Sequence, residues 1–338
     1  MNYFNDKIDN IKHHFEEKNW IYAINEKGTI FYKKTISLPT DEIIIKPSKK
    51  VINNPFNMVF NQFFDITMEF VQEKIGKCKI LNPINIYNAY KNNSFVSTGL
   101  EYYYNYLYKN EPISSDKSII LQPSLRFKLD FFNNNQFGYN NKYDFSSISF
   151  NNLSIVHFEK ELDMIKNIEN ILDYFSMLKI YASRVNFVVE NKIRQKENNI
   201  SYNAIKFFVD NLEVGDILFF KIKNEYLVEY GFGFERLLSR ILNKKYCDLF
   251  ISDNKYDNKT LLSSNFFTVL CMFDNENCNH GAKSKINMVL KNMDGNNDIM
   301  DLDLVYKNYL FWNQILLNTT YNTNFENIAK KYIKLLRR

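Results

Sequence analysis

Short β-rich runs that follow one another along the chain constrain its fold most strongly. Four of these runs are rich in Val, Ile and Phe: 184–190, 204–210, 216–223 and 226–230. Residues 224–225 form a turn between the last two runs. Strands joined by such turns pair as hairpins, because a parallel pair needs a long crossover connection. We therefore expect an α+β protein in which an antiparallel β-sheet is flanked by helices.

Helical periodicity surrounds these runs. Apolar residues recur at helical spacing over 56–75 and 234–242, and a further helix is expected over 159–180. Additional β-rich runs lie before that last helix: 94–99, 118–123, 124–133 and 147–158. The final strand, 226–230, leads directly into the helix at 234, and the pattern after about residue 258 is helical.

Three segments of the chain differ in pattern, and we expect three domains. Residues 1–55 combine a short helix with a hairpin signal over 20–37 and predict a small N-terminal α/β unit. Residues 56–252 contain the remaining strands and predict the main domain. Residues 253–338 predict a helical C-terminal domain.

The bulk properties indicate a cytoplasmic protein. No run approaches the 18 or so apolar residues that cross a bilayer, and the N-terminus is polar with mixed charge, unlike a signal peptide. The four cysteines are unevenly spread, as expected for free thiols in a reducing compartment. Cys271, Cys278 and His280 lack a fourth ligand and the usual zinc spacing, so we expect no metal site there.

The net charge of +5 does not by itself indicate a nucleic-acid partner. The basic residues are dispersed, apart from a group at the extreme C-terminus: Lys330, Lys331, Lys334, Arg337 and Arg338. A solvated tail and an RNA-contacting tail are both compatible with this group.

Two of only nine glycines lie one residue apart, in the segment VEYGFGFERLLSR (228–240). Gly231 and Gly233 therefore suggest a close approach of the backbone to a ligand. Known phosphate-binding motifs do not explain the pair. The third glycine and the βαβ alternation of a dinucleotide fold are missing, and the chain contains no GxxxxGK[ST] loop, no HRD, no DFG and no nucleophile elbow.

A nucleotide site of another kind fits the pattern. Arg236 begins the helix after the glycines and could contact a polyphosphate, and Arg126 lies mid-strand in LRFK. Phe150, on the returning strand, could stack on a base or could be an ordinary core residue. Two arginines, a stacking ring and a floor formed by Gly231 and Gly233 predict a nucleotide site on an antiparallel sheet.

These segments together resemble the catalytic domain of class II aminoacyl-tRNA synthetases, most closely alanyl-tRNA synthetase. GFGFER (231–236) is similar to the third signature of that class, GMGLER in this family. SFVSTGLEYYYNYL (94–107) resembles the first signature. QPSLRF (122–127) and SISFNNLSIVHF (147–158) resemble the two strands of the second. The likeness runs in order over about 60–290.

The resemblance implies a role for each matching residue in ATP binding. Arg126 would bind the α-phosphate and stabilise the charge that develops there. Arg236 would grip the γ-phosphate, and Phe150 would stack on adenine. Gly231 and Gly233 would floor the pocket. Mg²⁺ on the phosphates is also implied.

The resemblance further implies a site for an amino acid. Glu229 falls where the family has an Asp that pairs with the substrate ammonium, and Asp216 falls where it has an Asn. Each could instead be an ordinary carboxylate: Glu229 an exposed strand residue, and Asp216 a strand-start residue. The implied activity is formation of an aminoacyl-adenylate from a small amino acid and ATP, with transfer to tRNA or to another acceptor (a carrier protein, a peptide or a small molecule).

Departures from the family pattern leave a second hypothesis open. The segment RFKLDFFNNN replaces the family's RAGGKHNDLE after Arg126. A catalytically silent relative that serves as a binding or regulatory subunit would tolerate that change. The retained Arg126 and Arg236 favour an active ligase.

Overall fold

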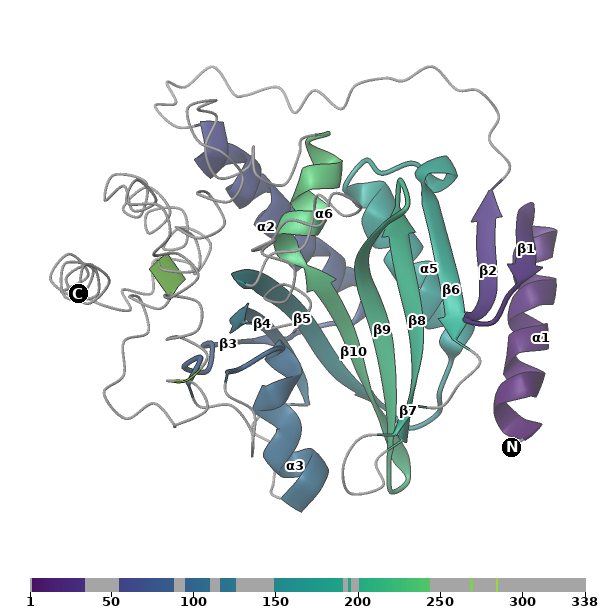
Figure 1. Cartoon of the computed structure of the whole chain (residues 1–338), viewed down its shortest axis with the longest axis horizontal. Coiled ribbons are helices and arrows are strands. Elements are labelled where there is room, and N and C mark those ends of the chain that lie inside the picture. The colour runs from purple at the N-terminus through teal and green to yellow at the C-terminus, as the bar shows by residue number, and fades with distance from the viewer. Residues whose placement is uncertain are drawn as a thin grey trace, which may run out of the picture. The chain divides into compact units, whose positions relative to one another are not determined.

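The structure, a computed structural model, describes seven stretches of the chain and three further residues (Figure 1). They are residues 2–33, 55–87, 95–109, 116–125, 149–190, 194–195 and 201–243, with 268, 269 and 284. The chain divides into two compact units. The first comprises Met1–Leu81, Tyr103–Ile120 and Leu153–Asn243; the second comprises Asn82–Tyr102, Leu121–Asn152 and Lys244–Arg338. The three-domain division expected from the sequence stays a prediction.

Ten strands of the described residues form one mainly antiparallel sheet (Figure 1). Their bounds are β1 Trp20–Ile24, β2 Gly28–Lys33, β3 Lys79–Leu81, β4 Lys117–Leu125, β5 Ser149–Glu159, β6 Val185–Glu190, β7 Arg194–Gln195, β8 Ser201–Val209, β9 Leu212–Ile222 and β10 Glu225–Gly233. The order is β1-β2-β6-β8-β9-β10-β5-β4-β3, with β7 paired to β8. The neighbours from β1 to β10 pair antiparallel, whereas β3 and β4 are parallel.

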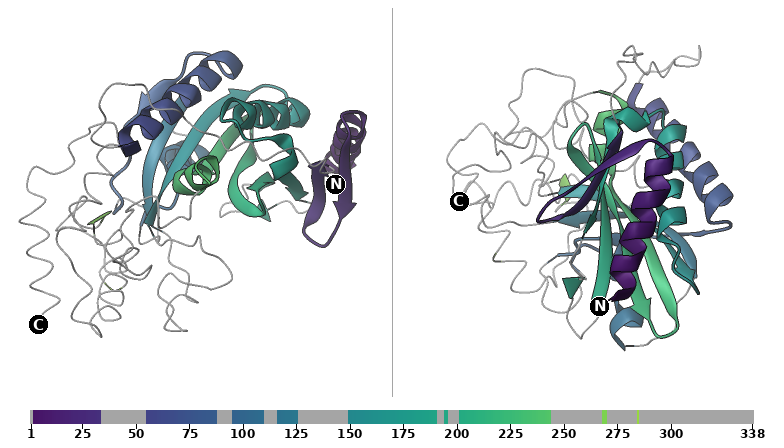
Figure 2. Two further views of the ribbon diagram at one scale, coloured as in Figure 1. Left: turned by 90° about the horizontal axis from the view of Figure 1, so that it is seen from above. Right: turned by 90° about the vertical axis from the view of Figure 1, so that its right-hand side faces the viewer.

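Helices flank this sheet. Their bounds are α1 Asn2–Glu17, α2 Pro55–Lys74, α3 Tyr104–Lys109, α5 Met164–Met177 and α6 Phe234–Ile241, with 3₁₀ helices η1 Gly99–Tyr103 and η2 Ala182–Arg184. Figure 2 shows α2 and α5 along one face of the sheet in the first unit. The expected α+β class, an antiparallel sheet flanked by helices, is thereby confirmed. Apart from residues 268, 269 and 284, the C-terminal region expected to be helical lies outside the described residues. None of the helices in the described stretches is long and apolar enough to span a membrane.

Side-chain alternation along β10 gives its two faces different chemistry. Tyr230 and Phe232 are buried against α5, where the Phe232 ring lies 5.4 Å from that of Tyr174 and 6.1 Å from that of Phe175. Because successive side chains of a strand point to opposite faces, Glu229 and Gly231 lie on the face away from α5. The helix-covered face forms the core, and the other face carries the polar positions of this strand.

The N-terminal hairpin extends the main sheet. The predicted strands and turn are present as β1 and β2, and β2 pairs with β6. Phe187 of β6 stacks on Phe31 of β2 with ring centroids 4.7 Å apart. Phe15 of α1 and Trp20 of β1 lie within 5.1 and 5.3 Å of the same ring. This aromatic cluster joins the first 33 residues to the sheet.

The prediction of a strand over 94–99 is wrong. Residues 95–98 have no regular structure, and η1 begins at Gly99. The Glu101 side chain accepts hydrogen bonds from the backbone N–H and the hydroxyl of Ser97, at 2.7 and 3.0 Å. Such local bonds to the backbone compete with a strand ladder and favour a turn. The β-rich composition of this segment therefore reflects burial of Phe95 and Val96 rather than a strand.

The aromatic cluster predicts that the N-terminal hairpin and the sheet unfold together. We expect Phe187→Ala to lower the free energy of unfolding by about 3–5 kcal/mol, because it leaves a cavity beside the rings of Phe15, Trp20 and Phe31. Tyr181→Ala, at a residue whose exposed fraction is 48%, should cost less than about 0.5 kcal/mol. Urea denaturation of both variants measures the two changes. Equal stability of the two variants would contradict this account of the cluster.

Candidate functional site

The structure brings four of the seven sequence-predicted site positions onto one strand–helix junction in the first unit. Glu229, Gly231 and Gly233 lie on β10, and Arg236 lies in the first turn of α6. Asp216, on the neighbouring strand β9, is the register partner of Gly231. The other two positions are not part of this junction as described: Phe150 is a half-buried residue of β5 in the second unit, and Arg126 lies outside the described residues.

Two carboxylates border the same point on the sheet. A Cβ atom at Gly231 would lie 3.0 Å from Oδ1 of Asp216 and 3.7 Å from Oε1 of Glu229. The absence of a side chain at Gly231, which is itself buried, therefore leaves a point on this face of the sheet that both carboxylates border. Oxygen atoms arranged in this way suit a ligand that carries a positive charge.

The Glu229 carboxylate is held by the neighbouring strand. Glu229 is 1% exposed, so the expectation of an exposed strand residue is wrong. The hydroxyl of Ser154 on β5, which is fully buried, donates to Oε1 of Glu229 at 2.5 Å. A buried carboxylate is costly unless it is hydrogen-bonded, so this contact helps to stabilise Glu229 in its position. Sequence reasoning missed Ser154 because no local pattern shows which residue of β5 lies beside β10.

Arg236 runs along the end of β10. A Cβ atom at Gly233 would lie 3.3 Å from Cδ of Arg236, so the glycine makes room for the arginine side chain. Nη1 of Arg236 donates to the carbonyl oxygen of Glu213 at 3.2 Å. A guanidinium group has five N–H donors, and this contact uses one of them. The junction thus holds the arginine in place through a backbone group rather than through a carboxylate.

A second cation belongs to the same face. Lys206 on β8 is the register partner of Asp216, which places both side chains on one face of the sheet. Nζ of Lys206 lies 2.9 Å from Oε2 of Glu213 and 4.0 Å from Oε1 of Glu190. Glu213 therefore contacts two cations, Lys206 through its carboxylate and Arg236 through its carbonyl. Lys206 was also missed, since its place beside Asp216 depends on the pairing of β8 with β9.

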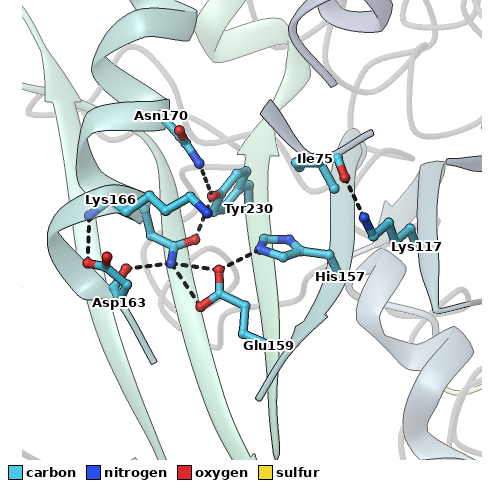
Figure 3. Close-up of polar contacts among 9 residues, drawn as sticks. Ile75, Lys117, His157, Glu159, Asp163, Lys166, Asn170 and Tyr230 are labelled. Carbon is cyan, nitrogen blue, oxygen red and sulfur yellow. Dashed lines mark hydrogen bonds and ion pairs between the residues drawn. The ribbon is translucent and has the colours of Figure 1, made fainter. Parts of the chain in front are cut away.

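The opposite face of β10 carries a buried polar network (Figure 3). The hydroxyl of Tyr230 donates to Oδ1 of Asn167 at 2.5 Å and accepts from Nδ2 of Asn170 at 3.2 Å. Nδ2 of Asn167 donates to both carboxylate oxygens of Glu159, at 3.1 and 3.2 Å. Nε2 of His157 donates to Oε1 of Glu159 at 3.2 Å.

Burial and hydrogen bonding shift the acidities in this network. Burial strongly raises the pKa of the Tyr230 phenol, which therefore stays protonated and able to donate. Burial also acts to raise the pKa of Glu159, but the hydrogen bonds from His157 and Asn167 outweigh it, and the pKa is lowered overall. Glu159 is thus an ionised acceptor at neutral pH.

The described residues contain no cluster of His, Cys, Asp and Glu that could hold a metal ion. The Mg²⁺ implied by the resemblance stays a prediction. Mg²⁺ at nucleotide sites is commonly bound mainly by substrate phosphates and water. A nucleotide site therefore does not require a cluster of metal-binding side chains. Cys271, Cys278 and His280 lie outside the described residues.

Comparisons with known proteins give distant structural likenesses, of which one is described here. No known protein family matches the chain. No curated protein matches it either. A structure from Leishmania major Friedlin, assigned as an aspartyl-tRNA synthetase, overlaps 60% of this chain and 65% of its own at a TM-score of 0.36 and 8% identity. At this similarity it carries no argument about fold or function, and the likeness to alanyl-tRNA synthetases stays a prediction.

The close approach of β9 to β10 predicts a sharp difference between two glycines. A Cβ atom at Gly215 would lie 2.4 Å from the carbonyl oxygen of Gly231 and 2.5 Å from the Phe232 ring. We expect Gly215→Ala to lower the free energy of unfolding by about 2–3 kcal/mol, because backbone must move. Gly231→Ala should cost less, since the Asp216 side chain can shift. Urea denaturation compares the two, and a Gly215→Ala protein as stable as wild type would contradict the geometry.

Glu159 predicts a pH-dependent contribution to stability. Because its pKa is lowered by folding, the ionised carboxylate stabilises the fold above the ordinary glutamate pKa of about 4.3. That contribution is lost as the pH falls through the lowered value. We therefore expect the difference in free energy of unfolding between wild type and Glu159→Gln to shrink from about pH 6 to about pH 3.

Urea denaturation over this pH range measures that difference. Glu161→Gln, at an exposed residue two positions along, is the control for loss of one charge. A difference for Glu159→Gln that stayed constant with pH would show that the carboxylate is not a stabilising acceptor.

Proposed function

We propose that this chain activates a small amino acid by forming its aminoacyl-adenylate from ATP, and passes the acyl group to tRNA or to another acceptor. One observation carries the proposal. The GFGFER segment forms a strand–helix junction on an antiparallel sheet, and the buried Glu229 carboxylate lies two residues before its first glycine, on the same face. The junction thus combines a site for a cation with an arginine for phosphate.

The carboxylates supply the amino-acid site. Glu229 is fixed by Ser154, and Asp216 reaches the same point above Gly231. A buried carboxylate attracts a cation more strongly than an exposed one, because the surroundings screen the charge less. The α-ammonium group of an amino acid fits this position, which would leave its carboxylate to react.

Arg236 supplies the phosphate site in this proposal. Its guanidinium group donates to the Glu213 carbonyl and retains further N–H donors for the γ-phosphate. In the reaction, a carboxylate oxygen of the amino acid attacks the α-phosphorus, the bond to the bridging oxygen breaks, and pyrophosphate leaves. Bound Mg²⁺ would neutralise charge on the phosphates. The roles of Arg126 at the α-phosphate and Phe150 at adenine rest on the sequence resemblance alone.

Amino-acid-dependent exchange of pyrophosphate into ATP tests this proposal. We expect exchange with one small amino acid or a few, among the twenty. Arg236→Ala should lower the exchange rate by about 100-fold or more, because it removes a preorganised charge at the phosphates. Glu229→Gln should raise the KM for the amino acid by about tenfold while the KM for ATP changes little.

Glu225→Gln is the matched control for Glu229→Gln. Glu225 lies four residues earlier on β10, on the same face, and accepts a hydrogen bond from the Tyr106 hydroxyl at 2.9 Å. Its loss should leave both KM values unchanged.

Full exchange activity in Arg236→Ala would contradict the proposed site. ATP binding without exchange for any amino acid would favour the silent binding or regulatory subunit. Filter binding with total tRNA over a salt series then addresses the acceptor.

A further inference from the structure

Tyr230 lies between two residues of the proposed site but points away from it. Glu229 and Gly231, its neighbours on β10, face the side where the carboxylates meet. The Tyr230 ring lies on the face that α5 covers, and it is fully buried. The position of this ring is therefore coupled through one strand to the position of the Glu229 carboxylate.

Residues of α5 supply both hydrogen-bond partners of the Tyr230 hydroxyl. Its hydroxyl donates to Asn167 at 2.5 Å and accepts from Asn170 at 3.2 Å (Figure 3). Asn167 and Asn170 are themselves buried and lie one turn apart on the helix. A phenylalanine would fill the same space without the cost of burying a hydroxyl, so packing alone does not account for a tyrosine here.

The network continues from α5 to β5, the strand beside β10 in the sheet. Asn167 donates to Glu159, which also accepts from His157. The His157 ring lies edge-on to the Tyr230 ring, with centroids 5.2 Å apart. A chain of hydrogen bonds therefore connects β10 to β5 through Asn167 of α5.

The same two strands are linked on the other face. There Ser154 of β5 donates to Glu229 of β10 at 2.5 Å. One pair of strands is thus held by a polar link on each face, and the two links are adjacent along β10. Displacement of β10 relative to β5 would stretch both.

We propose that Tyr230 is a positioning residue: its hydroxyl, held by Asn167 and Asn170 and, through Asn167, by Glu159 of β5, fixes β10 so that the Glu229 carboxylate lies where the substrate ammonium binds. The consequence for the substrate rests on the proposed function. Tyr230 touches no substrate and acts through Glu229.

Tyr174 provides a matched control. It is fully buried on α5, and its hydroxyl shares a 2.8 Å hydrogen bond with Thr67 of α2. Tyr174→Phe and Tyr230→Phe remove the same atom from the same side of the sheet. Only the second change cuts the link between β10 and β5. A purely structural role for the Tyr230 hydroxyl predicts that the two variants differ only in overall stability.

The test compares these variants by two measurements. Amide hydrogen–deuterium exchange of the free protein reads the local opening of β10, and pyrophosphate exchange reads the KM for the amino acid. We expect Tyr230→Phe to speed amide exchange in residues 225–233 by about fivefold over Tyr174→Phe, the effect of one lost buried hydrogen bond. The KM for the amino acid should rise by about fivefold, with little change in kcat.

Several outcomes separate this proposal from the proposed function. Equal amide exchange of β10 in the two variants would overturn the positioning role. Faster amide exchange with an unchanged KM would overturn it too. If no amino acid supports pyrophosphate exchange, the proposed function fails, and amide exchange alone decides whether Tyr230 holds β10. Should Tyr230→Phe not fold, Asn170→Ala removes one of the two hydrogen bonds and should shift both measurements in the same direction, by less.

Discussion

A hydrogen bond between two buried side chains, Ser154 and Glu229, determines what the polar face of β10 can do. Removing a carboxylate from water is costly, and the hydrogen bond from Ser154 offsets part of that cost. A positively charged group beside Glu229 would offset more of it. The position of Asp216 above Gly231 brings a second carboxylate to the same point, which reinforces the preference.

Glu213 contacts two of the cations described on this face. Arg236 is bound by the Glu213 carbonyl, and Lys206 by the Glu213 carboxylate. This part of the sheet thus carries two carboxylates beside Gly231 and two cations that contact Glu213. A substrate pair such as an amino acid and a nucleotide triphosphate carries that combination of charges.

Local sequence pattern predicted the parts of the structure that depend on periodicity. The junction of β10 with α6 follows from an apolar strand, two glycines and a helical spacing after Gly233. The long helix α2 lies within one residue of its predicted bounds. The prediction of a strand over 94–99 was wrong because the hydrogen bonds that Glu101 accepts from Ser97 favour a turn there. The domain division and the roles of all seven predicted site residues stay predictions.

The side-chain contacts that the sequence did not predict depend on how the strands pair. Ser154 contacts Glu229 because β5 lies beside β10, and Lys206 lies opposite Asp216 because β8 pairs with β9. The network around Tyr230 likewise depends on how α5 packs against the sheet. No spacing within a single segment carries this information. A buried Tyr and two Asn residues on an amphipathic helix are the available signals, and they do not indicate which atoms meet.

Discrimination between an amino acid and its α-hydroxy analogue tests the central claim most directly, because the two differ only in the ammonium group. Pyrophosphate exchange with both compounds measures it in wild type and in Glu229→Gln. The account predicts that wild type prefers the amino acid, and that Glu229→Gln loses about tenfold or more of this preference. An unchanged preference in Glu229→Gln would show that the buried carboxylate does not recognise the ammonium group.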